Sequence, residues 1–215
     1  MSTCHGRPAD WSVKMRATSR HLLLWGLPLL VAVSGCGYGP FDNKGYVTDN
    51  VIRMSQPDED ELAELLENDK IKSIVNLRGP NAGKEWYDTE LAFAQKHGID
   101  LYSVRLSTGR LPTREQLGDL IRIFKTAKHP LLMHCQGGAD RSGFGAVVYR
   151  LVILKDPLDD ALESFSVWHG HLKRYTPLDK LFDAYRDEAN GRSFEQWYER
   201  DYSVDRLNRK LDLDE

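Results

Sequence analysis

An abrupt change from apolar to polar residues in the middle of the chain constrains the fold most. The apolar run 130–133 leads into the polar, glycine-containing segment 134–142, and a second apolar stretch follows at 144–154. The short apolar run predicts a buried strand, and the longer one predicts a buried helix. A strand, a tight loop and a helix in this order are typical of an α/β protein with parallel strands.

The rest of the chain repeats this alternation. Strands are predicted at residues 51–54, 71–77, 101–106 and 131–134. Helices are predicted at residues 57–67, 86–97, 113–127, 143–155, 158–166, 177–189 and 193–208. We therefore expect an α/β fold with a mainly parallel central sheet and helices on both faces. Ligands of such sheets bind beyond the carboxyl ends of the strands, which is where segment 134–142 lies.

The polar segment contains the residue types of an anion site built around a thiol. Gly137 and Gly138 let the backbone approach a ligand closely, and the amide groups at a helix N-terminus attract anions. A cysteine at a helix N-terminus beside a cation ionises more readily than a free cysteine, which favours Cys135 as a nucleophile. The planar guanidinium of Arg141 would supply the charge and can hold two phosphate oxygens at once.

The residues HCQGGADRSG, 134–143, resemble the signature of cysteine-dependent phosphatases, H-C-x5-R-[ST]. They are similar in particular to the dual-specificity branch and its bacterial lipid- and tyrosine-phosphatase-like group, whose loops follow H-C-x-x-G-x-D-R-[ST]-G. The resemblance covers roughly residues 51–185 and includes the segments VIRMSQP and IVNLRG. It implies a dual-specificity-phosphatase-like fold and hydrolysis of phosphoric monoesters through a phosphocysteine intermediate, with no cofactor and no metal.

Each residue of the signature then has an expected role. The residues expected to contact the substrate phosphate are Gln136, Gly137, Gly138, Ala139 and Ser142. The Ser142 hydroxyl can also donate to the Cys135 thiolate and help it leave the phosphocysteine. His134 is expected to orient the loop rather than to carry a proton.

The general acid is missing from its usual place. In most relatives an aspartate lies on the loop after the strand that corresponds to 101–106, but here that loop, 107–112, contains no carboxylate. Asp140, inside the signature, is the best replacement as the acid that protonates the leaving group. Alternatively Asp140 braces the loop or contacts a substrate hydroxyl, and Glu85 and Asp88 are two further candidates for the acid.

The composition of the chain argues against some classes of binding partner. The chain has 215 residues and a net charge of −3 with well-mixed signs, which argues against nucleic acid as a partner. Its three cysteines, at positions 4, 36 and 135, fit no zinc pattern. His169 and His171 would point apart on a helix, so a metal pair is not expected there. Arg78, Lys84 and Arg110 are expected near the loop and could hold additional phosphates, although solvated loop charge also explains each of them.

The N-terminus has the pattern of a bacterial lipoprotein leader. A basic segment precedes the apolar run 22–33, which is shorter than the ~20 residues that span a bilayer. The sequence VSGC that follows resembles a lipobox, in which Cys36 would be lipidated. The predicted organisation is a leader within residues 1–36, a linker over 37–50 and a phosphatase domain over 51–210. Translation is expected to start at Met15. The protein would then be a monomer on the cell envelope, lipid-anchored and extracytoplasmic; an uncleaved anchor helix and a cytoplasmic protein are the alternatives.

The predicted substrates are phosphorylated molecules of several classes. They are phosphotyrosine or phosphoserine proteins, phosphoinositides and inositol phosphates. The alternative function is a membrane-tethered pseudophosphatase that binds phosphate without turnover. A sulfur-transfer protein of the rhodanese type also uses a loop cysteine, but the upstream strand–helix units and the pair Arg141–Ser142 argue against it.

Overall fold

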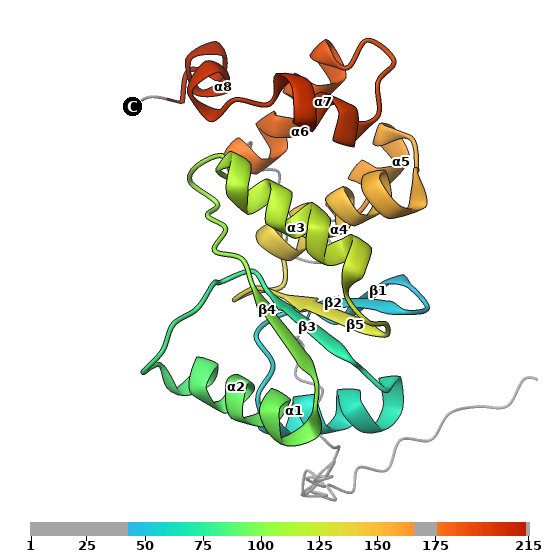
Figure 1. The fold of residues 1–215 in the computed structure, drawn as a ribbon, viewed down its shortest axis with the longest axis vertical. Helices are drawn as coiled ribbons and strands as arrows, with labels where there is room; N and C mark the ends of the chain where they lie inside the picture. Colours follow the sequence, from blue (N-terminus) through green and yellow to red (C-terminus); the bar gives the residue numbers. More distant parts are fainter. Residues whose placement is uncertain (1–42, 166–175, 214–215) are drawn as a thin grey trace, which may run out of the picture. The chain divides into compact units, whose positions relative to one another are not determined.

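A five-stranded sheet organises the molecule, and the predicted α/β class is confirmed (Figure 1). The computed structural model describes residues 43–165 and 176–213. The strands are β1 (Gly45–Thr48), β2 (Val51–Met54), β3 (Ser73–Asn76), β4 (Asp100–Ser103) and β5 (Leu131–His134). Their order in the sheet is β1-β2-β5-β3-β4, and every pairing is parallel except that of β1 with β2.

Helices cover both faces of the sheet. On one face lie α1 (Glu59–Glu64), continued by the π-helical turn 65–69, and α2 (Glu85–His97). On the other face lie α3 (Arg114–Thr126) and α4 (Asp140–Tyr149), which continues into a π-helical turn at 150–154. The remaining helices pack outside α3 and α4; they are α5 (Leu158–Leu162), α6 (Pro177–Glu188), α7 (Phe194–Asp201) and α8 (Val204–Leu211).

Local side-chain chemistry fixes where the helices begin and end. Asp58 caps α1 and Thr113 caps α3, each in a capping box with the residue three positions later. Gly98 ends α2 in the left-handed region, at φ 66°. These boundaries agree with those that the sequence predicts.

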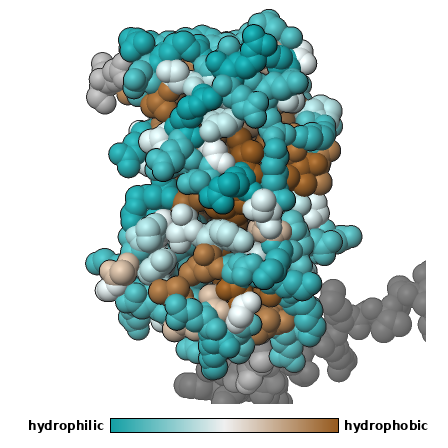
Figure 2. All heavy atoms as spheres, in the orientation of Figure 1, coloured by the Kyte–Doolittle hydropathy of each residue, from teal (hydrophilic) through white to brown (hydrophobic). Residues whose placement is uncertain are grey.

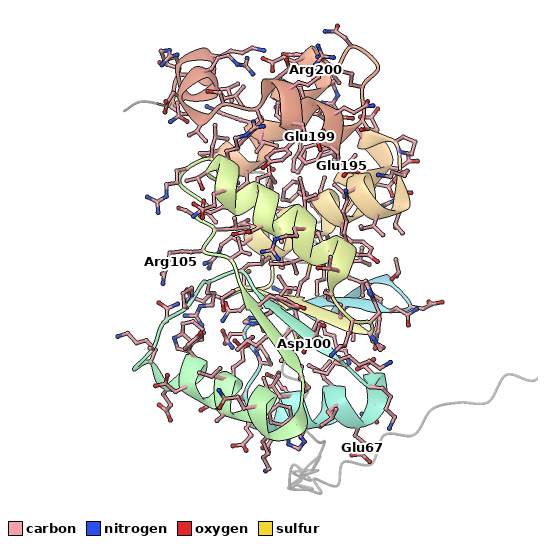
Figure 3. All side chains as sticks on the ribbon, in the orientation of Figure 1. Glu67, Asp100, Arg105, Glu195, Glu199 and Arg200 are labelled. Atoms are coloured by element: carbon pink, nitrogen blue, oxygen red, sulfur yellow. The ribbon has the colours of Figure 1, made fainter. Side chains whose placement is uncertain are left out.

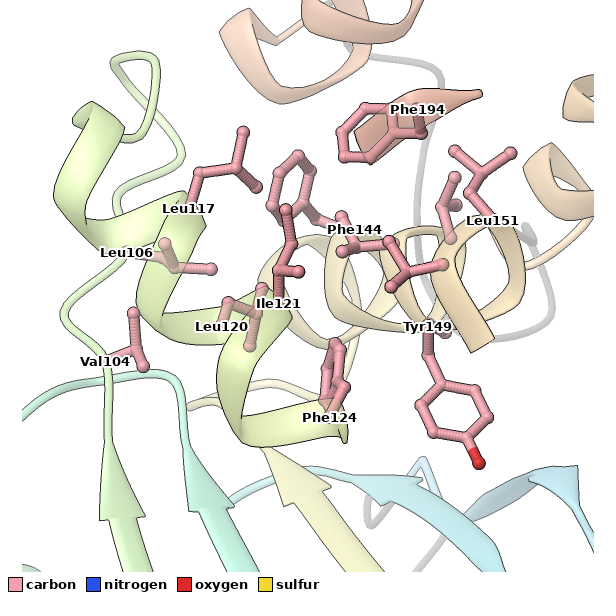
Figure 4. Packing of buried hydrophobic residues seen from close by; sticks show 14 of the residues in the cluster. Val104, Leu106, Leu117, Leu120, Ile121, Phe124, Phe144, Tyr149, Leu151 and Phe194 are labelled. Atoms are coloured by element: carbon pink, nitrogen blue, oxygen red, sulfur yellow. The ribbon is translucent and has the colours of Figure 1, made fainter. Parts of the chain in front are cut away.

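The sheet separates two hydrophobic clusters. The larger one joins the sheet to α3 and α4, where Leu120, Phe124 and Phe144 interdigitate (Figure 4). The smaller one joins it to α1 and α2 through residues such as Leu62 and Phe93. The face drawn in Figure 2 is mostly hydrophilic, with hydrophobic residues visible in smaller patches between the helices. Because both faces of β5 are covered, the strand that leads into the loop is held rigidly.

Three predicted boundaries are wrong. Residues 45–48 of the expected linker form β1, because Tyr46, Val47 and Thr48 favour a strand and the turn at 49–50 folds them back on β2. Helix α4 begins at Asp140 and not at residue 143. The single helix expected over 193–208 is two helices, with Tyr202 and Ser203 between them.

The predicted leader, with Met15 and Cys36, lies outside the described residues. Within the described ranges, no helix is both long and apolar enough to cross a bilayer.

Candidate active site

The candidate site lies where three parallel strands end together. In the register of the sheet, Met54 of β2 and Asn76 of β3 are both paired with His134 of β5. The segments that follow these three residues therefore meet at one edge of the sheet. The loop 135–139 leaves β5 at this edge and enters α4.

Every main-chain carbonyl of the loop from Cys135 to Ala139 has a partner on the outer side of the loop. The pairs are Cys135 O with His134 Nδ1 (3.3 Å), Gln136 O with the Gln56 amide (3.2 Å), Gly137 O with Asn43 Nδ2 (2.5 Å), and Gly138 O and Ala139 O with Arg53 Nη2 (2.9 Å each). In a trans peptide the N–H group points away from the preceding carbonyl. The amides of residues 136–140 are therefore turned to the inner side, where they form an anion-binding concavity.

Gly138 is required by this arrangement. Its φ is 68°, in the left-handed region. A Cβ atom at this position would lie 2.6 Å from both Asn43 Cβ and the Ser55 amide nitrogen, closer than real contacts allow. Glycine therefore lets the loop pass directly against the end of β2.

Cys135 lies at the base of the loop, between the sheet and the first turn of α4. Its side chain is buried, with 2% of the residue exposed. The sulfur lies 3.7 Å from the buried Ser142 hydroxyl, a hydrogen-bonding distance for sulfur. Asp140 and Arg141 are half-buried in that same first turn. The fold thus brings the thiol together with the hydroxyl at the loop, and it places Arg141 in the same first turn of α4.

A buried polar cluster supports the loop from the side of α2. His134 Nε2 lies 2.6 Å from Glu90 Oε1, and both residues are completely buried. The two atoms are in close contact, without the alignment of a hydrogen bond. The other Glu90 oxygen accepts from Asn76 Nδ2 at 2.7 Å. His134 therefore connects the start of the loop with α2, and Glu90 is a contact of this cluster that the sequence does not reveal.

A second arginine, Arg78, lies at the edge of the site. Its guanidinium carbon is 3.5 Å from the centre of the Trp86 ring, and Nη1 donates to Gln56 Oε1 at 2.9 Å. Burial lowers the pKa of Arg78, and the like charge of Arg141 lowers it further, whereas Cys135 and Glu90 act in the opposite direction. Arg78 is therefore held rigidly within electrostatic range of both signature residues.

The other predicted phosphate ligands are not tied to the loop. Lys84 and Arg110 are exposed and form no ion pair with a described residue. Arg105, which extends outward from the segment after β4 (Figure 3), donates to Asn81 Oδ1 and to the Pro80 carbonyl. Of the three cations that the sequence predicts near the loop, Arg78 is therefore the one that lies within electrostatic range of Arg141 and Cys135.

The acid candidates differ in their surroundings. Asp140 is the first residue of α4 and lies within electrostatic range of Arg53. The Asp88 carboxylate accepts from the Gly83 amide at 3.0 and 3.2 Å, so it is engaged in capping a turn. Glu85 is exposed and, with Trp86, lines a hollow of about 480 Å³ beside the loop.

Metal chemistry has no obvious support in the described ranges, where no three His, Cys, Asp or Glu side chains are grouped closely enough to hold an ion. His169 and His171 lie outside the described residues.

A family comparison places this geometry among known proteins. Residues 43–165 match the family described as "DSP-PTPase phosphatase fused to NAD+ Kinase". The chain belongs to this phosphatase family. Its phosphatase signature and α/β fold are therefore those of the dual-specificity and tyrosine phosphatases, as the sequence resemblance implies.

Individual relatives agree with this assignment. The inositol diphosphatase SIW14 of Saccharomyces cerevisiae is 29% identical over 109 residues, which are 48% of this chain and 37% of that protein. The chain thus spans little more than a third of the length of this curated relative. The crystal structure of the SIW14 core catalytic domain aligns with a TM-score of 0.51 and 22% identity over 80% of this chain and 94% of the other. TpbA of P. aeruginosa aligns with a TM-score of 0.51 and 21% identity over 82% and 94%. At these identities the two structures show the shared fold.

Besides Glu90, sequence reasoning missed two residues that contact this phosphatase loop directly, Arg53 and Asn43. Arg53 does carry a signal, because a lone arginine interrupts the apolar run VIRM of a buried strand. Asn43 carries none, because its contact with the loop depends on the position of β1.

Proposed function

We propose that this chain is a cysteine-dependent phosphatase that acts through a phosphocysteine intermediate. The observation that carries the proposal is the loop in which every carbonyl from Cys135 to Ala139 is turned outward around a buried thiol. Inward amides stabilise negative charge on the equatorial oxygens of a transferring phosphoryl group without reorganising. In this proposal the Cys135 thiol at the base of the loop attacks the phosphorus atom.

Two displacement steps complete the reaction. The Cys135 thiolate attacks phosphorus, an S–P bond forms, and the bond from phosphorus to the leaving oxygen breaks with its electron pair going to that oxygen. Water then attacks the phosphocysteine, the S–P bond breaks, and inorganic phosphate leaves while the sulfur recovers its electron pair. Arg141 binds the phosphoryl oxygens in both steps, and the Ser142 hydroxyl stabilises the departing thiolate.

We propose inositol phosphates that carry a diphosphate group as the preferred substrates. An alkoxide leaving group needs a proton from a general acid, but a leaving phosphate is far less basic and needs little assistance. The absence of a carboxylate from 107–112 is therefore tolerable for a phosphoanhydride. Arg78, within range of Arg141, provides a second cation for the leaving phosphate. The curated relative SIW14, described as an inositol diphosphatase, supports this choice.

Turnover of paired substrates tests both parts of the proposal. Cys135→Ser is expected to abolish release of phosphate from every substrate. Binding of substrate without release of phosphate by the wild-type protein would favour the pseudophosphatase.

Asp140→Asn is expected to slow hydrolysis of an alkyl phosphate by roughly 10²- to 10⁴-fold, the usual contribution of a general acid. The rate of the same variant with an inositol diphosphate should fall much less. Faster turnover of phosphotyrosine peptides or phosphoinositides than of inositol diphosphates would contradict the substrate assignment.

We further propose that the protein is a monomer, lipid-anchored at Cys36 outside the cytoplasm. The support is the basic and apolar pattern of residues 14–36, which ends in VSGC. Metabolic labelling with a radioactive fatty acid is expected to mark the wild-type protein and not a Cys36→Ser variant. Equal labelling of the two proteins, or none of the wild type, would contradict this localisation.

A further inference from the structure

Arg53 is a charged residue inside the sheet layer. It lies on β2, where 3% of the residue is exposed, and its side chain passes under the loop 135–139. Burial lowers the pKa of Arg53 to about 10, whereas Cys135 and Asp140 act in the opposite direction. The guanidinium thus remains charged at neutral pH in a place where a charge is costly.

Within residues 43–165 and 176–213, the hydrogen bonds of this guanidinium are with main-chain carbonyls. Nη2 donates to Gly138 O and Ala139 O at 2.9 Å each, and Nη1 donates to the Ser164 carbonyl. Nε is buried with no partner, and Arg53 forms no ion pair with a described carboxylate. Among the described residues, its positive charge is offset by the carbonyls of Gly138, Ala139 and Ser164 and by the nearby Cys135 and Asp140.

We propose that Arg53 is a positioning residue for phosphoryl transfer, which grips two loop carbonyls from outside and so turns the amides of Ala139 and Asp140 toward the phosphate. The inference rests on the proposed phosphatase function. The two amides follow the two gripped carbonyls, and a trans peptide directs each of them to the opposite side of the chain. Without this contact, the carbonyl oxygen of Gly138 is free to rotate toward the anion and repel it, whereas that of Ala139 still accepts from the Gly143 amide at 2.9 Å.

Arginine suits this position better than lysine. One terminal nitrogen of its planar fork reaches two carbonyls while the other reaches the Ser164 carbonyl on a separate segment. A lysine ammonium is a point charge and keeps the charge without the fork. The pair of variants Arg53→Lys and Arg53→Met therefore separates the role of geometry from that of charge.

Binding of tungstate, a tetrahedral dianion, tests the inference independently of turnover. Isothermal titration calorimetry is carried out on full-length Cys135→Ser protein, alone and combined with Arg53→Lys or Arg53→Met. Arg53→Lys is expected to weaken tungstate binding about 10-fold, and Arg53→Met roughly 10- to 100-fold, the range of a lost hydrogen bond to a charged group. A merely structural role would lower the fraction of protein that binds and leave the dissociation constant of the rest unchanged.

Controls keep the outcome decisive. Arg122→Met removes an exposed arginine that is paired with Asp119 on α3, far from the loop, and should bind tungstate like the parent. If Arg53→Met does not fold, Arg53→Lys alone decides the question. Unchanged tungstate affinity in the folded Arg53 variants would overturn the inference, even if the wild-type protein turns over substrate. Weakened tungstate affinity would support the positioning role of Arg53 in the anion site, even if the protein does not hydrolyse the proposed substrates.

Discussion

At the scale of single residues, only one of two adjacent glycines is constrained by the fold. Gly138 has a positive φ, and a Cβ atom added to it would lie 2.6 Å from atoms of Asn43 and Ser55. Gly137 has neither constraint, because its φ is not positive and an added Cβ would meet nothing within 4 Å. Only Gly138 is therefore required by the packing of the loop against β2.

We predict that Gly138→Ala destabilises the protein by about 1–3 kcal/mol, because it combines a left-handed backbone with a steric clash. The variant should also lose most of its phosphatase activity, since the clash displaces the loop. Urea unfolding and steady-state kinetics measure the two effects. Gly137→Ala is the matched control and should change stability little. Equal effects of the two substitutions would show that the loop does not pack as described.

At the scale of helices and strands, sequence prediction succeeded where the signals are local. The capping residues Asp58 and Thr113 and the glycine at 98 gave correct helix boundaries, because each satisfies nearby backbone groups. The tail failed because its apolar periodicity continues across Tyr202 and Ser203. Ser203 marks the break locally as the N-cap of α8, where its side chain accepts from the Arg206 amide. A tertiary contact adds to it, because Tyr202 OH donates to the Pro112 carbonyl at 2.5 Å.

One carboxylate joins the three C-terminal helices. Glu188 of α6 accepts from Arg206 and Lys210 of α8 and from Trp197 of α7. The hydrogen bond from Arg206 is the largest of the causes that lower the pKa of Glu188 from 4.5 to about 2, while partial burial opposes it. Because the folded-state pKa is depressed, the stabilisation is fully present above about pH 5 and is lost as the pH falls toward 2.

We therefore predict that Glu188→Gln destabilises the protein at pH 7 and that the difference from wild type shrinks at pH 3. Urea unfolding of both proteins across this range measures the difference. Glu199→Gln, which changes an exposed carboxylate on the neighbouring α7, is the control and should show little difference at either pH. A Glu188→Gln effect that is independent of pH would contradict the electrostatic origin.

At the scale of the whole molecule, the site depends on residues far apart in the sequence. The signature alone predicted Cys135, Arg141 and the strand–loop–helix around them, because those residues are contiguous. The outer supports were not predictable, since Asn43 and Glu90 reach the loop only through the pairing of β1 and the packing of α2. The sequence could thus indicate where the site lies, but not the contacts of Asn43 and Glu90 that support it.

The N-terminal boundary of the folded domain follows from this dependence. A chain beginning at residue 37 keeps β1, the contact of Asn43 with Gly137 and the ion pair of Lys44 with Asp69 at 2.8 Å. We predict that it retains wild-type phosphatase activity and melting temperature. A chain beginning at residue 51 should melt at a lower temperature and lose activity, because the edge of β2 and the carbonyl of Gly137 are left uncovered. Equal behaviour of the two chains would show that β1 is dispensable.

Covalent capture of the reaction intermediate tests the central claim most directly. Full-length protein is mixed with an inositol diphosphate, quenched in acid within milliseconds, digested and analysed by mass spectrometry. The account predicts a phosphorylated peptide that carries the phosphate on Cys135, and its absence from the Cys135→Ser protein. Turnover without any phosphate on Cys135, or turnover that survives Cys135→Ser, would contradict it.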